Sequence, residues 1–281
     1  MNLGRTGIWS IELRVADPAE IAEAAAELEE LGYGALWIPG LDGGDILGAC
    51  ARLLSATRSL TVATGVTSIW LQPAAGLAAD RARLQHHDRL LTGLGVSSPA
   101  SAGSRPFRPL ADMNAYLDGL DASDEPLPVS DRMLAAMGPQ MIKLAARRAA
   151  GIHPFMVTPN FSAQARELLG AGPLLAPYQA VVLDRDATRA RAAGRGFLGA
   201  ALAMPAYRNS LRRQGFTDAD LADGGSDRLI DAVLAWGDLD AIADRVRAHL
   251  AAGADHVSLH VLPQGPSLPR DAWRELATLG V

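Results

Sequence analysis

The sequence predicts an α/β fold, a (β/α)8 barrel that forms one domain over residues 1–281. Short apolar runs alternate with longer amphipathic runs, which is typical of βαβ units and a parallel sheet. Eight such short runs can be counted, and eight is the number of strands that closes this kind of barrel. The length also suits one barrel domain, because barrels of this class need about 250 residues.

Each expected strand is an apolar run bounded by turn residues. The eight runs are 7–12, 35–39, 60–66, 90–97, 132–137, 151–157, 176–183 and 256–262. The expected helices between them are 17–31, 45–57, 73–88, 108–120, 139–149, 162–169 and 238–252. The first helix has the clearest ends, because Asp17 and Pro18 favour a helix start and Gly32 a helix stop. After the seventh strand, residues 184–237 form a mostly helical insertion, the usual place for substrate specificity in a barrel.

Composition excludes several classes of function. The net charge of −5 and the pI near 5.7 argue against a nucleic-acid partner. No apolar run reaches the ~18 residues of a membrane span. The single cysteine, Cys50, rules out an intrachain disulfide, and its apolar helix indicates a buried, inert thiol. We therefore expect a cytoplasmic protein with a small-molecule partner, and no metal, because no His, Asp and Glu cluster has ligand spacing.

Three stretches at expected strand ends mark the candidate site, because barrel sites lie at the C-terminal ends of the strands. In the first (Thr64, Gly65, Val66, Thr67), a glycine among β-branched residues indicates a bulge beside a ligand or a simple bend. In the second (Gly95, Val96, Ser97), small residues leave room above the barrel. The third (Ala136, Met137, Gly138, Pro139) begins a helix, so it is either an anion site or a plain turn.

Together, several stretches of the chain resemble the luciferase-like monooxygenase superfamily. They include LGYGALWIPGLDGGD, LTVATGVTSIW, LLTGLGVSS, MLAAMGPQMIKLAARRAAGIHPFMVTP and GDLDAIADRVRAHLAAGADHVSL. More narrowly, the chain is similar to the actinobacterial branch of oxidoreductases that depend on the deazaflavin coenzyme F420. The resemblance covers nearly the whole chain, and the order and spacing of the stretches carry it rather than any one motif.

The resemblance implies a barrel that seats a flavin-like ring against the bulge at 64–67, with a non-prolyl cis peptide at Gly65–Val66. It places the cofactor phosphate near 136–139. The implied reaction is hydride transfer between F420 and a small to medium organic substrate. The alternatives are an FMN-dependent monooxygenase on the same barrel, and a non-catalytic cofactor-binding or partner subunit. Relatives commonly dimerise, so a homodimer is expected.

The sequence departs from the family at the positions that usually assist proton transfer. Gly40 follows the second strand and Ser98 the fourth, and neither side chain is a general acid at neutral pH. Three alternatives follow: the reaction needs no acid from the protein, another residue donates the proton, or the chain has lost catalysis and only binds. Substitutes are Asp42, Asp45 (or a helix cap), His153 (or a structural histidine facing the sheet) and His260 (facing either the barrel interior or its mouth). Further candidates are the pocket residues Trp9 and Trp70, with Gly40 and Ser98, and the arginines Arg105 and Arg108, which either clamp a carboxylate tail or lie on a solvated loop.

Overall fold

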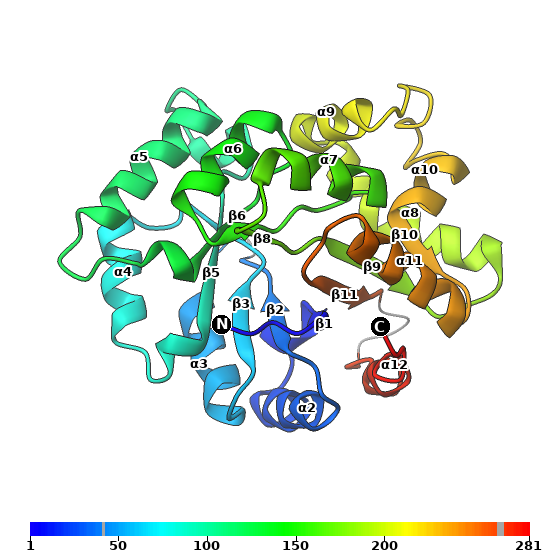
Figure 1. Ribbon diagram of the computed structural model, residues 1–281, viewed down its shortest axis with the longest axis horizontal. Helices are drawn as coiled ribbons and strands as arrows, with labels where there is room; N and C mark the ends of the chain where they lie inside the picture. Colours follow the sequence, from blue (N-terminus) through cyan, green and yellow to red (C-terminus); the bar gives the residue numbers. More distant parts are fainter. Residues whose placement is uncertain (41–42, 263–266) are drawn as a thin grey trace.

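Parallel strands form the centre of the molecule, and helices surround them (Figure 1). The computed structural model describes residues 1–40, 43–262 and 267–281. Within these residues the strands are β1 (Thr6–Trp9), β2 (Ala35–Ile38), β3 (Thr61–Thr64), β4 (Thr67–Ser68), β5 (Leu90–Gly95), β6 (Arg132–Leu134), β7 (Gly151–Ile152), β8 (Leu174–Leu175), β9 (Tyr178–Val182), β10 (Leu234–Trp236) and β11 (Val257–Val261).

The sheet closes on itself through one interrupted strand. β8 and β9 belong to a single extended stretch, 174–182, broken at Pro177, which has no N–H to donate. On one side, the Ala176 N–H donates to the carbonyl of Ile152 in β7; on the other, the Ser258 N–H of β11 donates to the carbonyl of Pro177, both at 3.0 Å. The ring therefore runs β1, β2, β3, β5, β6, β7, β8–β9 and β11, and β11 pairs with β1. This confirms the predicted (β/α)8 barrel.

The helices follow one another around the barrel in chain order, with α8 to α10 outside that order (Figure 1). They are α1 (Glu12–Val15), α2 (Pro18–Glu30), α3 (Ile46–Ala56), α4 (Ala74–Ala82), α5 (Pro109–Asp121), α6 (Pro139–Arg148), α7 (Pro159–Leu169), α8 (Ala187–Leu202), α9 (Pro205–Arg213), α10 (Asp227–Val233), α11 (Leu239–Ala251) and α12 (Arg270–Leu276). The predicted start of α2 is confirmed, because the Asp17 side chain accepts from the N–H groups of Ala19 and Glu20.

One part of the predicted helical insertion is wrong. Residues 234–236 form β10, which pairs with β9 in parallel. The physical reason is an open edge: β7 ends at Ile152, whereas β9 continues to Val182, and β10 supplies hydrogen-bond partners where β7 no longer can. Several predicted elements are also too long: the strands expected at 132–137 and 151–157 end at Leu134 and Ile152. The helix expected at 73–88 ends at Ala82, and the strand expected at 7–12 ends at Trp9 because Glu12 begins α1.

Alternate residues of the strands fill the inside of the barrel. In β2, Ala35 and Trp37 belong to the inner core, while Leu36 and Ile38 pack in the core beneath the helices. Trp37 is fully buried there; its ring stacks on His153 at 4.2 Å, and its Nε1–H donates to Nε2 of His256 at 3.0 Å. The inside of the barrel is therefore a packed core rather than a ligand cavity.

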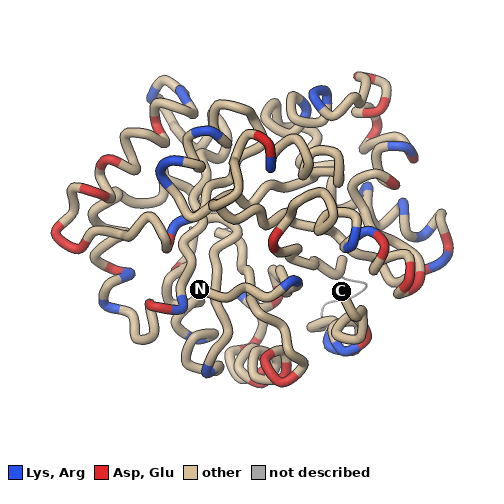
Figure 2. The backbone as a smooth tube through the Cα atoms, in the orientation of Figure 1, with Lys and Arg blue, Asp and Glu red and all other residues tan. Residues whose placement is uncertain are grey.

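The charged residues lie mainly on the outer helices and turns, with both signs interspersed, and the central strands carry few of them (Figure 2). None of the helices described for residues 1–40, 43–262 and 267–281 combines the length and the apolar character needed to cross a bilayer.

Candidate functional site

The third barrel strand is interrupted by a bulge at its C-terminal end. From Ala63 to Thr67 it advances four residues while its partner β5 advances three, from Leu91 to Leu94, so one residue is extra. The peptide bond Gly65–Val66 within the bulge is cis, as the resemblance implies. The bulge is anchored to β2, because the Gly65 N–H donates to the carbonyl of Ile38 (2.8 Å) and the Gly40 N–H to the carbonyl of Val66 (3.1 Å).

The glycines of β5 make room for this bulge. A Cβ on Gly93 would lie 2.0 Å from the carbonyl oxygen of Thr64, and one on Gly95 would lie 2.7 Å from the Val66 side chain. Thr64 Oγ1 both accepts from the Gly93 N–H (2.8 Å) and donates to the Gly93 carbonyl (2.9 Å). The side chain thus replaces the backbone pairing that the bulge removes. Thr64, a predicted cofactor contact, is fully buried in this role.

Gly40, where the resemblance leads one to expect an ionisable side chain, is close-packed against the same bulge. A Cβ at this position would lie 2.4 Å from the carbonyl oxygen of Val66 and 2.8 Å from Cα of Thr67. Both are backbone atoms, so the clash cannot be relieved by turning a side chain. With this backbone, an acidic side chain does not fit at position 40.

A pocket of about 340 Å³ opens over the bulge at the C-terminal ends of the strands. It contains predicted residues from distant parts of the chain: Trp9, Gly40, Gly65, Val66, Gly95, Val96, Ser97, Met137 and His153. Ser68 and Ala135, which also line it, directly adjoin the predicted stretches. Its remaining lining residues were missed by the sequence analysis: Pro39, Phe155, Phe197, Met204, Ala206 and Tyr207. The size falls within the roughly 300–1,000 Å³ of small-molecule sites, and the lining is mostly apolar and aromatic, as such sites are.

Other predicted site residues do not line this pocket: Thr64, Thr67, Trp70, Ser98, Ala136, Gly138, Pro139 and His260. Ala136 is fully buried in the core beneath the helices, and Thr67 is buried within β4. Gly138 and Pro139 lie one step beyond Met137, at the start of α6. Asp42 lies outside the described residues. The side chain of Asp45 accepts from the Gly48 N–H and caps α3.

His153 is a neutral hydrogen-bond acceptor in the pocket wall. Its Nδ1 lies 2.8 Å from the carbonyl of Ala176, and because a carbonyl only accepts, Nδ1 carries the proton. Nε2 therefore holds a free lone pair. It faces the bulge, since a Cβ on Gly65 would lie 3.0 Å from it. Burial lowers the pKa of His153 to about 4, so the ring stays neutral at pH 7.

His260 lies behind the wall rather than in it. Its ring packs 4.6 Å from the ring of Trp9, and its Nδ1 lies 2.6 Å from the Tyr178 hydroxyl. Burial lowers the pKa of His260 to about 3. Trp9 in turn donates from Nε1 to the carbonyl of Gly65 at 3.1 Å. His260 thus helps to hold Trp9 against the bulge and does not itself reach the pocket.

The insertion supplies one wall of the pocket. Phe197 comes from α8, and Met204, Ala206 and Tyr207 come from the turn into α9 and its first residues. Phe155, after β7, packs between them, with its ring 6.3 Å from Phe197 and 5.4 Å from Tyr207. The only sequence signal for this wall was the apolar stretch 204–207 within a charged helical segment.

The far end of the pocket leads to the N-terminus of α6. Met137 lines the pocket and comes just before Gly138, the N-cap residue of this helix. The guanidinium of Arg213, on α9, donates to the carbonyl of Met137 at 3.2 Å. Free N–H groups at a helix start and a nearby cation favour an anion. A flat, mostly apolar ring with an anionic side chain therefore fits the residues present. The described part of the chain holds no cluster of three or more potential metal ligands.

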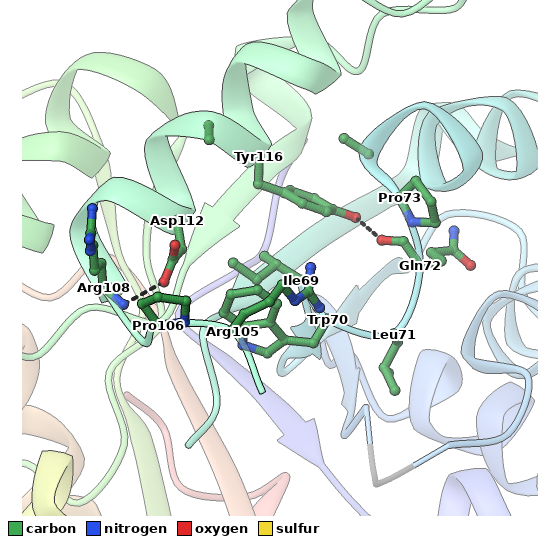
Figure 3. Close-up of a pocket in the computed structure, with 12 residues that line it drawn as sticks. Ile69, Trp70, Leu71, Gln72, Pro73, Arg105, Pro106, Arg108, Asp112 and Tyr116 are labelled. Carbon is green, nitrogen blue, oxygen red and sulfur yellow. Dashed lines mark hydrogen bonds between the residues drawn. The ribbon is translucent and has the colours of Figure 1, made fainter. Parts of the chain in front are cut away.

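A second, larger cavity of about 730 Å³ lies beside Trp70 (Figure 3). Its walls include Arg105 and Arg108, and the Arg105 guanidinium lies 4.5 Å from the centre of the Trp70 ring. Trp70 donates from Nε1 to the carbonyl of Val96 at 2.8 Å, which fixes it next to the central pocket. The two arginines and Trp70 thus belong to this outer cavity, away from the bulge.

The barrel of this chain matches solved structures over nearly its whole length. No protein-family model and no curated protein matches the sequence. Solved structures do: an F420-dependent secondary alcohol dehydrogenase with an F420-acetone adduct has a TM-score of 0.71 and 15% identity, covering 98% of both chains. The coenzyme F420-dependent tetrahydromethanopterin reductase of Methanopyrus kandleri has a TM-score of 0.70 and 16% identity, covering 99% of this chain and 98% of that one.

The FMN-bound oxygenating constituent of 3,6-diketocamphane monooxygenase from Pseudomonas putida shares the fold as well. Its TM-score is 0.65 at 13% identity, covering 99% of this chain and 96% of that one. At these identities the similarity establishes the fold, which extends over the whole chain.

Proposed function

We propose that this protein is a luciferase-like oxidoreductase that uses coenzyme F420 to transfer hydride to or from a small to medium organic substrate. The observation that carries the proposal is the apolar pocket over the bulge, with a helix N-terminus and Arg213 at its far end. Two solved structures of the same fold bear F420 in their names, which supports this choice of cofactor.

Each part of the site has a task in this proposal. The backbone of Gly65–Val66 and of 95–97 would hold the ring, and the start of α6 with Arg213 would hold its anionic side chain. His153 Nε2 would accept a hydrogen bond from an N–H of the ring. Bound F420 supplies the hydride, and the aromatic walls exclude water from the reacting atoms.

Two alternatives are each favoured by one observation. The FMN-bound structure of the same fold favours an FMN-dependent monooxygenase. The lack of an acid at positions 40 and 98 favours a non-catalytic cofactor-binding or partner subunit.

Titration with F420 and with FMN, followed by fluorescence and absorbance, tests the cofactor. We expect micromolar binding of F420 and at least tenfold weaker binding of FMN. Turnover is then measured as oxidation of reduced F420 with a panel of ketones, aldehydes and enones. Tighter binding of FMN would replace F420 in the proposal, tight binding without turnover would favour the non-catalytic subunit, and binding of neither would refute the site.

A matched pair of variants locates the binding. Ala135→Leu fills space in the pocket, whereas Ala75→Leu makes the same change on the exposed face of α4. We expect only Ala135→Leu to abolish F420 binding. Light scattering of the same samples tests the expected homodimer.

A further inference from the structure

The hydroxyl of Tyr207 stands apart from those of the other tyrosines. The chain has four tyrosines. Tyr33 donates to the carbonyl of Trp273 (2.7 Å), Tyr116 donates to the carbonyl of Gln72 (3.2 Å), and Tyr178 lies 2.6 Å from His260. The Tyr207 hydroxyl makes no hydrogen bond to any described residue, although its side chain lines the pocket. Tyr207 is half-buried and its hydroxyl is not sealed in the core, so the hydroxyl is free to donate to a ligand that enters the pocket.

The other polar side chains of the pocket wall are poorer proton donors. His153 presents a lone pair rather than a proton. The hydroxyls of Ser68 and Ser97 are much weaker acids than a phenol. No Asp, Glu, Lys or Arg occurs among the described residues that line the pocket. Burial raises the pKa of Tyr207, so the phenol keeps its proton at neutral pH.

We propose that Tyr207 is the proton donor of the reaction and that the pocket selects uncharged carbonyl substrates, whose oxygen accepts a hydrogen bond from the Tyr207 hydroxyl. This inference rests on the proposed function for the source of hydride. It assigns to the insertion the acid that positions 40 and 98 lack. The lack of charge in the described lining supports the substrate class, because an ionised substrate would lose its hydration without gaining a partner.

The proton and electron balance of the step is complete in the direction of reduction. The carbonyl carbon of the substrate gains a hydride, which brings two electrons, from the reduced deazaflavin or flavin. The electron pair of the C=O π bond moves to the oxygen, and the oxygen takes the proton from Tyr207 Oη. The product is an alcohol, the cofactor leaves oxidised, and the phenolate regains a proton from water.

A chromophoric aldehyde tests the donor without any cofactor. The absorption band of 4-(dimethylamino)cinnamaldehyde moves to longer wavelength when its carbonyl oxygen accepts a strong hydrogen bond. We expect this red shift on binding to the parent protein and its loss in Tyr207→Phe, which keeps the aromatic ring against Phe155. Tyr116→Phe removes the same atom outside the pocket and should keep the shift. No shift with the parent, or a full shift with Tyr207→Phe, would overturn the inference.

Kinetics with the cofactor that binds gives the second measurement. A general acid contributes roughly 10²–10⁴-fold, so we expect kcat of Tyr207→Phe to fall about 100-fold while KM changes less than about tenfold. A kcat equal to that of the parent would refute the role of Tyr207 and leave the oxidoreductase standing. A red shift that depends on Tyr207 in a protein that binds neither cofactor would keep the carbonyl site and refute the proposed function.

Discussion

Acid should unfold this protein well above the pH at which its carboxylates titrate, because four of its six histidines are buried and neutral. Burial lowers the pKa of His153 and His256 to about 4 and that of His249 and His260 to about 3, from 6.5 for an exposed ring. In His256, Nδ1 lies 3.0 Å from the carbonyl of Gly4 and Nε2 accepts from the indole of Trp37. A second proton on this ring would have no acceptor.

The sign and the size of the effect follow from these values. Below pH 6.5 the histidines of the unfolded chain bind protons, whereas His153 and His256 of the folded protein stay neutral down to about pH 4. The free energy of unfolding therefore falls as the pH falls. At pH 5 each ring costs about 2 kcal/mol, and the four together about 8 kcal/mol. Domains of this kind have about 5–15 kcal/mol of stability in total. The protein should therefore lose half or more of its stability by pH 5.

Urea unfolding followed by circular dichroism at several pH values between 8 and 5 measures this dependence. His249→Gln tests its origin, because His249 is held between the Ser162 hydroxyl (2.9 Å) and Oε1 of Gln179 (3.2 Å), away from the pocket. Below pH 6, the free energy of unfolding of the variant should depend on pH about a quarter less steeply than that of the parent. Above pH 7.5, the free energy of unfolding should not depend on the protonation of His249. A parent whose stability is the same at pH 7 and pH 5, or a variant with the full slope, would refute the reasoning.

Three further changes test the core and the bulge. Gly40→Ala should weaken F420 binding about tenfold or more, because its Cβ would press on the Val66 carbonyl; unchanged affinity in a fluorescence titration would contradict this. Trp37→Phe should lower the free energy of unfolding by about 2–4 kcal/mol, since Nε2 of His256 loses its donor, and urea unfolding at pH 8 measures the loss. Burial raises the pKa of the Cys50 thiol to about 12, so a disulfide reagent should react with it only after unfolding, and rapid reaction with the folded protein would argue against the packing.

The barrel could be predicted because its strands are buried on both faces, so that each appears as a short apolar run. The bulge could be predicted as well, because Gly65 interrupts a β-branched run at a strand end. β10 could not be predicted, because it forms only where β9 extends beyond the end of β7. The local sequence does not determine where a strand ends. The residues of β10 continue the apolar pattern of α10, which favours a helix. They form a strand instead because they pair with β9.

The candidate site was predicted unevenly for a similar reason. Residues whose backbone forms the bulge, such as Gly65 and Val66, follow from position alone. The direction of the neighbouring side chains could not be predicted, because the extra residue of the bulge changes which side of the sheet each side chain points to. Thr64, for example, points to Gly93. Phe197 and Tyr207 escaped prediction because the apolar face of a helix does not reveal whether it covers a core or the mouth of a barrel.

The pocket is assembled from two independent sources, strand ends below and the turn between α8 and α9 above. Because the two parts come from separate segments of the chain, the upper wall can be changed by substitution while the lower wall is kept. Exchanging residues 204–207 at this turn, with Arg213 kept, should therefore change the upper wall of the pocket and leave its strand-end floor unaltered.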